Sequence, residues 1–488
     1  MAGPQTSQAL ATLSGPPAPD SATFARWAEG QRRRRLMEGT WKPDLKGALA
    51  REYDPTRRRL LGMPDTTKNL FRSLIWQLAV LYDRPPVIWG SDAVGLMRQI
   101  TDDAGLWQMA STLQQNTLAQ REGFYRFDVT ADLRLLVRIV PTDLLWAEAP
   151  ADDPDRPHTI HEYRMRETRP GRLEWTRDVL SIQDPDRPVY RVESGDGKID
   201  LSDFFLGRVG GLSGDLYPYR SADGEPLIPG VIYHARRTGR LWDPFTGIEL
   251  VDGTLAVAGL WTQWRHLVRD ASWPQRWAIN ASVQGIEANR GGDLAVVTDP
   301  STLLNFRPTV PGQPSTVGQF APGGDPKELG DAIRSYAADL AQDFDLAPAD
   351  IARTHVDARS GYAIEITREA QRTAQRRFEP QFKRGDLQSL SVIAALWNAQ
   401  AGSTELPEDG WDIEYPGLPY SMAERKMIME DHKMRADLGI TSKPRLLAAL
   451  EGMTTDQARE RLIEMQADAM IFDASPAQPT QPTPDESE

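Results

Sequence analysis

The amino-acid sequence predicts an α+β protein built from several domains, and three observations support this. Apolar residues follow helical spacing up to about residue 122, and then alternate as in β-strands, between turns rich in Asp, Pro and Gly. From Gly253 onward, two helical patterns flank a short segment of strand and turn signals. The length of 488 residues corresponds to about three domains.

The composition limits the classes of function. The net charge of -13 argues against tight binding of nucleic acid through its phosphates, but not against a protein past which DNA slides. The absence of cysteine excludes disulfides and thiolate metal sites. No signal peptide or long apolar window is present, so we expect a soluble, cytoplasmic protein without a membrane partner.

The N-terminal third is predicted to be helical after a disordered arm. Residues 1–20 are rich in Pro, Ala, Ser and Gly, and a helix begins near Ser21. The run Arg32–Arg35 can indicate nucleic-acid binding, although the charged face of a helix is the favoured interpretation. Further helices are predicted over Asn69–Tyr82 and Ser91–Glu122.

Short antiparallel strands are predicted next. They cover Phe124–Val129, Leu133–Val140, Thr159–Arg166, Arg172–Trp175, Val189–Val192 and Val231–His234. Two segments of this region partly match metal-binding motifs. Glu193–Phe204 has part of the spacing of a calcium loop but is better explained as a hairpin turn. His158 and His161 would face opposite sides of a strand, so we expect no zinc site and no other metal.

The two helical patterns around the insert predict a stalk with a tip. The first covers Gly253–Trp273 and is stopped by Pro274, and the second begins at Asp325-Pro326, a favourable N-cap and first helical residue. We expect six residues to pack within this stalk: Trp261, Trp264, Leu267, Ile333, Tyr336 and Leu340. The insert is too small to bury much core alone, so neighbouring subunits are expected to stabilise it.

A loop and a long charged helix follow the stalk. The helix is predicted to begin at Gly361, to kink at Pro380 and to continue to Trp397. A strand at residues 411–416, further helices up to Met470 and a disordered Pro-rich tail complete the chain. The sequence contains no P-loop, dinucleotide fingerprint or nucleophile elbow, so we expect a structural protein that is not an enzyme and has no cofactor.

Several separated stretches, in this order, resemble the portal proteins (head-to-tail connectors) of tailed bacteriophages. The most characteristic is the Ser-Gly-x-Ala turn at Ser360-Gly361-Tyr362-Ala363 before the long wing helix. The others are Leu81–Pro86, Val251–Leu255 through Trp273–Arg276, Gly291–Asp293 followed by Val317–Phe320, and Leu438–Lys443 through Gly452–Thr454. Together the resemblance covers about residues 69 to 466.

The resemblance implies a mixed α/β wing, a two-helix stem, a small β-rich clip and an α-helical crown, assembled into a ring. It places the wing at 21–252 and 347–410, the stem at 253–274 and 326–346, the clip at 275–325 and the crown at 411–470, between a disordered arm at 1–20 and a disordered tail at 471–488. Residues 347–410 would hold the channel loop and the long wing helix.

A protein of this family is expected to form a ring, usually a dodecamer, at one vertex of the virion capsid after assembly in the host cytoplasm. Double-stranded DNA would pass through the ring during packaging and ejection. The implied partners are other copies of the chain, the large terminase subunit, a head-tail adaptor, and the major capsid and scaffolding proteins. We expect the DNA-channel loop to lie in Asp345–Arg359 and name five candidates there and at its end: Arg353, His355, Arg359, Ser360 and Gly361.

Alternatives remain open at this point. Arg353, His355 and Arg359 would serve either for transient DNA contact or for ion pairs between subunits. The whole chain could instead be a subunit of a DNA-processing (nuclease or terminase) complex, or another oligomeric capsid or tail adaptor.

Overall fold

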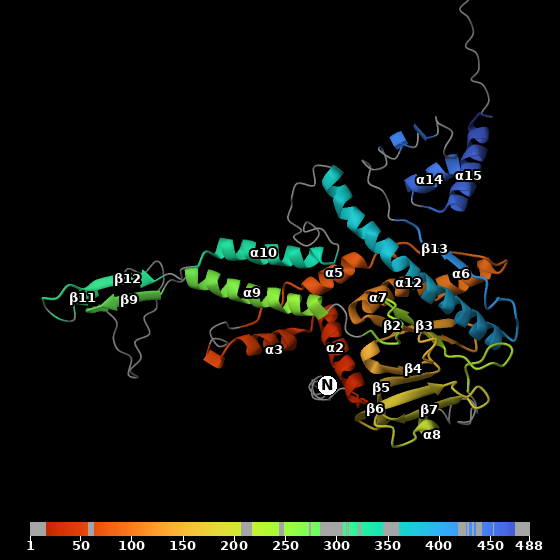
Figure 1. Ribbon diagram of the computed structural model, residues 1–488, viewed down its shortest axis with the longest axis horizontal. Coiled ribbons are helices and arrows are strands. Elements are labelled where there is room, and N and C mark those ends of the chain that lie inside the picture. Colours follow the sequence, from red (N-terminus) through yellow and green to blue (C-terminus); the bar gives the residue numbers. More distant parts are fainter. Residues whose placement is uncertain are drawn as a thin grey trace, which may run out of the picture. The chain divides into compact units, whose positions relative to one another are not determined.

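The computed structural model confirms an α+β chain (Figure 1). It describes residues 16–56, 63–205, 217–243, 248–272, 275–283, 306–308, 310, 312–320, 324–344, 361–417, 426, 429–431, 434–435, 442–451 and 453–473. The chain divides into two compact units. The first comprises Met1–Glu38, Phe71–Ile248 and Ala341–Glu488, and the second comprises Gly39–Leu70 and Glu249–Leu340.

The first unit contains two antiparallel sheets. One has the order β3-β2-β8, with β2 at Glu122–Val129, β3 at Leu135–Val140 and β8 at Gly230–His234. The other has the order β4-β5-β6-β7, with strands at Leu145–Glu148, Thr159–Arg169, Arg172–Ser181 and Val189–Ser194. The predicted strands are therefore confirmed, and most extend a few residues beyond the predicted ends.

The first unit also contains eight described helices. They are α2 (Ser21–Glu38), α5 (Leu70–Leu78, which begins at the unit boundary), α6 (Val94–Asp103), α7 (Leu106–Gln120), the short α8 (Ser202–Phe205), α12 (Gly361–Ala401), α14 (Lys443–Glu451) and α15 (Thr455–Asp473). Among them, α2, α7 and α12 contact the sheets. A single turn, η1, covers Thr142–Leu144, and β1 (Val87–Trp89) pairs with β13 (Asp412–Glu414). Pro380 lies inside α12 without ending it. A Cβ at Gly385 would lie 2.5 Å from Tyr233, so glycine allows α12 to approach β8 this closely.

Two predicted helices differ from the observed ones. The helix predicted over Asn69–Tyr82 ends at Leu78, because the backbone N–H of Leu81 donates to the side chain of Gln114 at 3.1 Å rather than to the helix. The single helix predicted over Ser91–Glu122 is two helices, α6 and α7. They are separated at Gly105, whose φ of 62° is left-handed. Glu122 already belongs to β2.

The structure also bears on three smaller predictions for the first unit. Arg33 is only 2% exposed and its Nε donates to Glu29 at 2.9 Å, so the arginine run does not lie wholly on a solvated helix face as expected. The segment tested as a calcium loop is a turn with Gly197 at φ 72°. His161 lies on β5 against Trp146, with ring centroids 4.3 Å apart, and the helix that a zinc signature needs is absent there.

The second unit contains the stalk. Its helices are α3 (Lys42–Glu52), α9 (Ile248–Ser272) and α10 (Pro326–Gln342). Two strand pairs form its tip: β9 (Gln275–Ile279) with β12 (Thr316–Phe320), and β10 (Ala281–Val283) with β11 (Phe306–Pro308). Figure 1 shows α9 and α10 side by side with these strands at one end. No helix in the described part of the chain is long and apolar enough to span a membrane.

Candidate functional site: the stalk and the polar cores

Glycine residues set the distance between the two stalk helices. A Cβ at Gly253 of α9 would lie 2.4 Å from Cδ2 of Leu340 on α10, which is closer than real Cβ atoms approach. A Cβ at Gly330 of α10 would lie 3.2 Å from Nε1 of Trp264. The helices therefore pack closely at both ends of α10, and each contact joins a glycine on one helix to a large side chain on the other.

Specific hydrogen bonds fix the start of α10. Oδ1 of Asp325 accepts the backbone N–H of Lys327 at 2.7 Å, and its carbonyl accepts that of Leu329 at 3.1 Å, as the predicted N-cap requires. The indole N–H of Trp264 donates to the carbonyl of Pro326 at 2.7 Å. This bond links α9 to the first turn of α10.

The six residues expected to pack in the stalk have different environments. Ile333 is 1% exposed, and Leu340 is also buried. Trp261 and Trp264 contact each other edge to face with ring centroids 5.2 Å apart, and both are half-buried, as is Leu267. Tyr336 is 44% exposed on this chain, so it does not pack within the stalk of one subunit.

Residues 39–70 also belong to the stalk unit, which the sequence analysis did not predict because it placed them in the wing. The backbone N–H of Asp65 donates to Thr262 Oγ1 at 2.8 Å, and Arg265 lies 3.7 Å from the Asp65 carboxylate. A Cβ at Gly259 would meet Leu49 of α3 at 3.6 Å. No local sequence signal marks these contacts, since each joins residues about 200 positions apart.

The tip of the stalk is organised by Asn280, between β9 and β10. Its φ of 52° is left-handed, a conformation that asparagine tolerates better than most residues. Its Nδ2 donates to the carbonyl of Gln313 at 3.0 Å and its Oδ1 accepts the N–H of Val310 at 2.8 Å. Two large apolar side chains remain at this tip: Ile279 is 64% exposed and Val310 is 46% exposed.

Four of the five candidates for the channel loop are not among the residues that the structure describes. Arg353, His355, Arg359 and Ser360 lie outside the described residues. Gly361 is the first residue of α12, where the sequence predicted the start of the long helix.

A buried carboxylate joins α12 to three other segments of the first unit. Asp386 accepts the hydroxyl of Tyr82 at 2.8 Å and that of Tyr233 at 2.7 Å, and it also accepts that of Tyr415. Burial raises the pKa of Asp386 to about 6, although the three hydroxyl donors act to lower it. The sequence analysis missed this cluster, because nothing local distinguishes one aspartate among 69 acidic residues.

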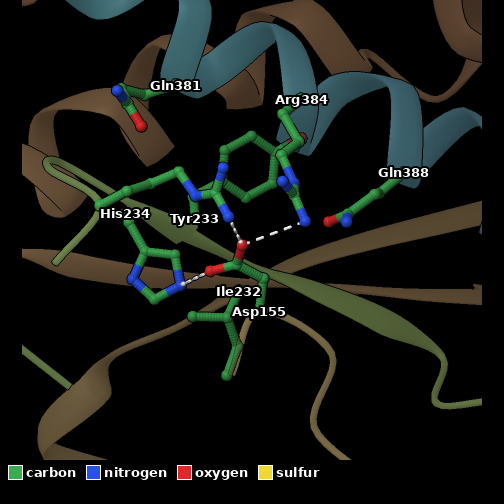
Figure 2. A pocket seen from close by; sticks show the side chains of 9 residues that line it. Asp155, Ile232, Tyr233, His234, Gln381, Arg384 and Gln388 are labelled. Carbon is green, nitrogen blue, oxygen red and sulfur yellow. Dashed lines mark hydrogen bonds and ion pairs between the residues drawn. The ribbon is translucent and has the colours of Figure 1, made fainter. Parts of the chain in front are cut away.

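A second polar cluster surrounds Asp155 on the loop before β5 (Figure 2). Its Oδ2 lies 3.1 Å from Nη2 of Arg384 on α12 and also accepts a bond from Arg237. Nε2 of His234 lies 3.6 Å from Oδ1 of Asp155, and burial lowers the pKa of this histidine. The cluster thus ties α12 to the end of β8.

A third cluster connects the two sheets. Glu162 on β5 accepts bonds from Arg126 at 2.6 Å, Arg138 at 2.5 Å and Arg164 at 2.7 Å. Burial alone would raise the pKa of Glu162, but the arginines lower it to about 2. Among the described residues, no group of three or more His, Asp or Glu side chains has the arrangement of a metal site.

Comparisons with known proteins give a structural likeness. No protein-family model matches the chain, and no curated protein matches it. A chain of the virion of a native gene transfer agent (GTA) particle is 13% identical, with a TM-score of 0.38, and the match covers 92% of this chain and 98% of that one. A chain from the neck of the native GTA particle, computed with C12 symmetry, is 14% identical with a TM-score of 0.39, covering 79% and 89%. Both TM-scores are below 0.5.

Proposed function

We propose that this chain is a structural subunit of a phage-type head, and specifically the portal protein whose ring forms the DNA channel at one capsid vertex. The observation that carries this proposal is the stalk: two closely packed helices with a strand-paired tip, inserted between the parts of a larger α+β unit. This is the arrangement of stem and clip that the resemblance implies. In this proposal the role of the chain is structural and not enzymatic.

The exposed apolar residues of the stalk unit support assembly with other copies. Tyr336 on α10 and Ile279 and Val310 at the tip are large side chains that one chain leaves exposed. Exposed apolar surface of this kind is typical of protein interfaces. In a closed ring, a different surface of the neighbouring subunit would cover it.

The partners follow from this placement. The tip would dock the terminase during packaging and the head-tail adaptor afterwards, while the larger unit would contact the capsid and scaffolding proteins. Double-stranded DNA would pass through without tight binding, because a chain of net charge -13 weakly repels the phosphates. The site of action would be the virion, after assembly in the host cytoplasm.

Size-exclusion chromatography with light scattering, followed by electron microscopy, tests the proposal. The expected result is a closed ring, most often of twelve subunits, with a central hole close to the width of duplex DNA. A chain that stays monomeric at high concentration, or that forms open filaments, would show the proposal to be wrong.

The channel loop remains part of the proposal and has its own test. A variant with Arg353→Ala, His355→Ala and Arg359→Ala should still form rings if these residues contact DNA, and the packaging rate should fall. If they form ion pairs between subunits instead, the same variant should lose ring assembly at physiological salt. Light scattering and a packaging assay on the same preparation separate these two roles.

A further inference from the structure

A hollow in the first unit lies beside the start of strand β8, where Gly230 and Val231 line it. Strand β8 pairs with β2 on one side, and no strand among the described residues pairs with its other side. Ala235 donates its N–H to Arg121, and Phe127 donates its N–H to Pro229. The alternation of an antiparallel ladder therefore turns the backbone groups of Ile232 toward the free edge.

This hollow, the β8 groove, has a volume of about 380 Å³. Its apolar lining comes from the segment leading into β8, the loop before β5, the end of β6 and helix α12: Pro157, Ile182, Pro226, Leu227, Ile228, Val231, Val392 and Ala395. A second, smaller cavity of about 10 Å³, here called the narrow extension, is lined by Ile232 and shares Asp155 and Gln388 with the first. Volumes of this size and lining are typical of ligand sites in proteins.

The two ends of the β8 groove carry opposite charge. At one end, Arg237 and Arg384 pair with Asp155, while the neighbouring Arg156 pairs with Asp153. The three guanidinium groups outnumber these two carboxylates. At the other end, Glu408 lies close to Asp223 and Asp409, and its burial and these two carboxylates raise its pKa. An occupant with a carboxylate at the first end and a cation at the second would complement the charge at both ends of the groove.

Two buried polar atoms point to a polar occupant at the narrow end. Oε1 of Gln381 is buried and has no hydrogen-bond partner in the described part of the chain, and Nε2 of His234, 3.6 Å from Oδ1 of Asp155, makes no hydrogen bond either. Both residues line the narrow extension, and Figure 2 shows His234 beside Asp155 and Gln381 on helix α12. Buried polar atoms are normally hydrogen-bonded, so a polar group reaching this end, directly or through one water, would satisfy them.

We propose that the β8 groove binds an extended peptide segment of a partner protein, which adds as an antiparallel strand to the free edge of β8. Residues Gln388 to Ala395 of α12 span about 10 Å at 1.5 Å per residue. About three extended residues of a partner cover that length. Their apolar side chains would fill the cavity, and an acidic residue on one side and a basic residue on the other would meet the charged ends. This inference does not depend on ring formation.

Peptide binding to the purified chain tests the proposal. The probe is acetyl-Asp-Val-Thr-Val-Lys-amide, whose acidic end meets the arginines in the antiparallel orientation. Titration calorimetry should detect it, and an N-methylated copy that lacks the strand N–H groups should bind at least about tenfold more weakly. A reversed peptide with Lys first and Asp last should also bind more weakly.

Two variants with matched controls locate the site. Val392→Arg places a long side chain in the groove and should abolish binding, while Gln400→Arg, exposed on the same helix, should not. Arg156→Glu reverses one charge at the cationic end and should weaken binding about tenfold, while Arg236→Glu at an exposed position nearby should have little effect. An unchanged melting temperature shows that each variant is folded.

Three results would overturn the proposal. The first is no heat of binding, and the second is equal affinity for the normal and N-methylated peptides, which would indicate an apolar small-molecule pocket. The third is binding to monomer but not to assembled chain, which would assign the groove to a second copy. A failed peptide titration leaves the ring measurement unaffected, so this inference and the proposed function fail separately.

Discussion

At the scale of single residues, Asp386 holds together a buried hydrogen-bond cluster in the first unit. Its carboxylate is fully buried, and three tyrosine hydroxyls from separate segments donate to it. Removing the shared carboxylate leaves buried hydroxyls without their acceptor, which costs more than one hydrogen bond contributes. The cluster therefore makes the packing of α12 depend on one side chain.

Asp386→Ala is expected to lower the free energy of unfolding by about 3–5 kcal/mol, because it removes the shared acceptor of three buried hydroxyls, of which Tyr233 keeps a bond to Ser389. Tyr415→Phe removes only one donor and is expected to cost about 1–2 kcal/mol. Denaturant unfolding at pH 7 measures both. Equal losses for the two variants would contradict the central position of the carboxylate.

The same residue predicts a pH dependence. The pKa of Asp386 is raised from 3.8 to about 6 in the folded chain, so the folded state binds more protons than the unfolded state between these values. Its contribution to stability is therefore present near pH 4 and is lost as the pH rises through 6. The stability of the wild type minus that of Asp386→Asn should fall by up to about 3 kcal/mol across this window and stay constant above it.

Asp132→Asn provides a control of opposite sign. The pKa of the exposed Asp132 is lowered, first by the hydrogen bond from Thr130, so its small contribution is lost as the pH falls. The stability of the wild type minus that of Asp132→Asn should rise with pH. If the corresponding difference for Asp386→Asn also rose with pH, the pKa of Asp386 would not be raised in the folded chain.

At the scale of elements, the close contact between α9 and α10 depends on glycine at position 253, which has no side chain. Gly253→Ala should lower the free energy of unfolding of the stalk unit by about 1–3 kcal/mol, because the new Cβ overlaps Leu340. In the double variant with Leu340→Ala, the added methyl group should no longer clash. The double variant should therefore be more stable than the sum of the two single effects predicts.

Gly47→Ala is the matched control in α3 of the same unit. A Cβ at this position meets nothing within 4 Å, so the change should stabilise the helix by about 0.5–1 kcal/mol. Thermal unfolding, followed by circular dichroism, measures the change in stability of both variants. A stabilising effect of Gly253→Ala would show that the helices do not approach each other as closely as described.

The elements themselves were largely predictable, but several of their ends were not. Helical spacing and the Asp325-Pro326 cap predicted α9 and α10, because these signals are local. The ends of α5 and the break between α6 and α7 depend on Gln114 and on the left-handed Gly105. Gln114 accepts a backbone N–H more than thirty residues away, so the sequence around Leu81 carries no local sign that α5 ends there.

At the scale of the whole molecule, the exposed Tyr336 links the single chain to its proposed assembly. Tyr336→Asp should leave the melting temperature of the monomer nearly unchanged, because the side chain is already 44% exposed. It should reduce ring formation strongly by placing a charge where a neighbour is expected to pack. Ser335→Asp, the adjacent exposed position on α10, serves as the control, and light scattering compares the two.

Identical assembly by both variants and the wild type would show that Tyr336 lies away from any subunit interface. The stalk would then need another surface for assembly, with the exposed Ile279 and Val310 of the tip as the next positions to change.

The sequence by itself determined the fold class, the antiparallel strands and the stalk with its insert, because periodicity, prolines and caps act within a few residues of where they are read. Only the tertiary structure decided that residues 39–70 belong with the stalk, that Asp386 gathers three tyrosines, and that β8 has a free edge beside an apolar groove. Each of these features joins positions far apart in the chain, and the burial that gives them their chemistry exists only once those segments pack together.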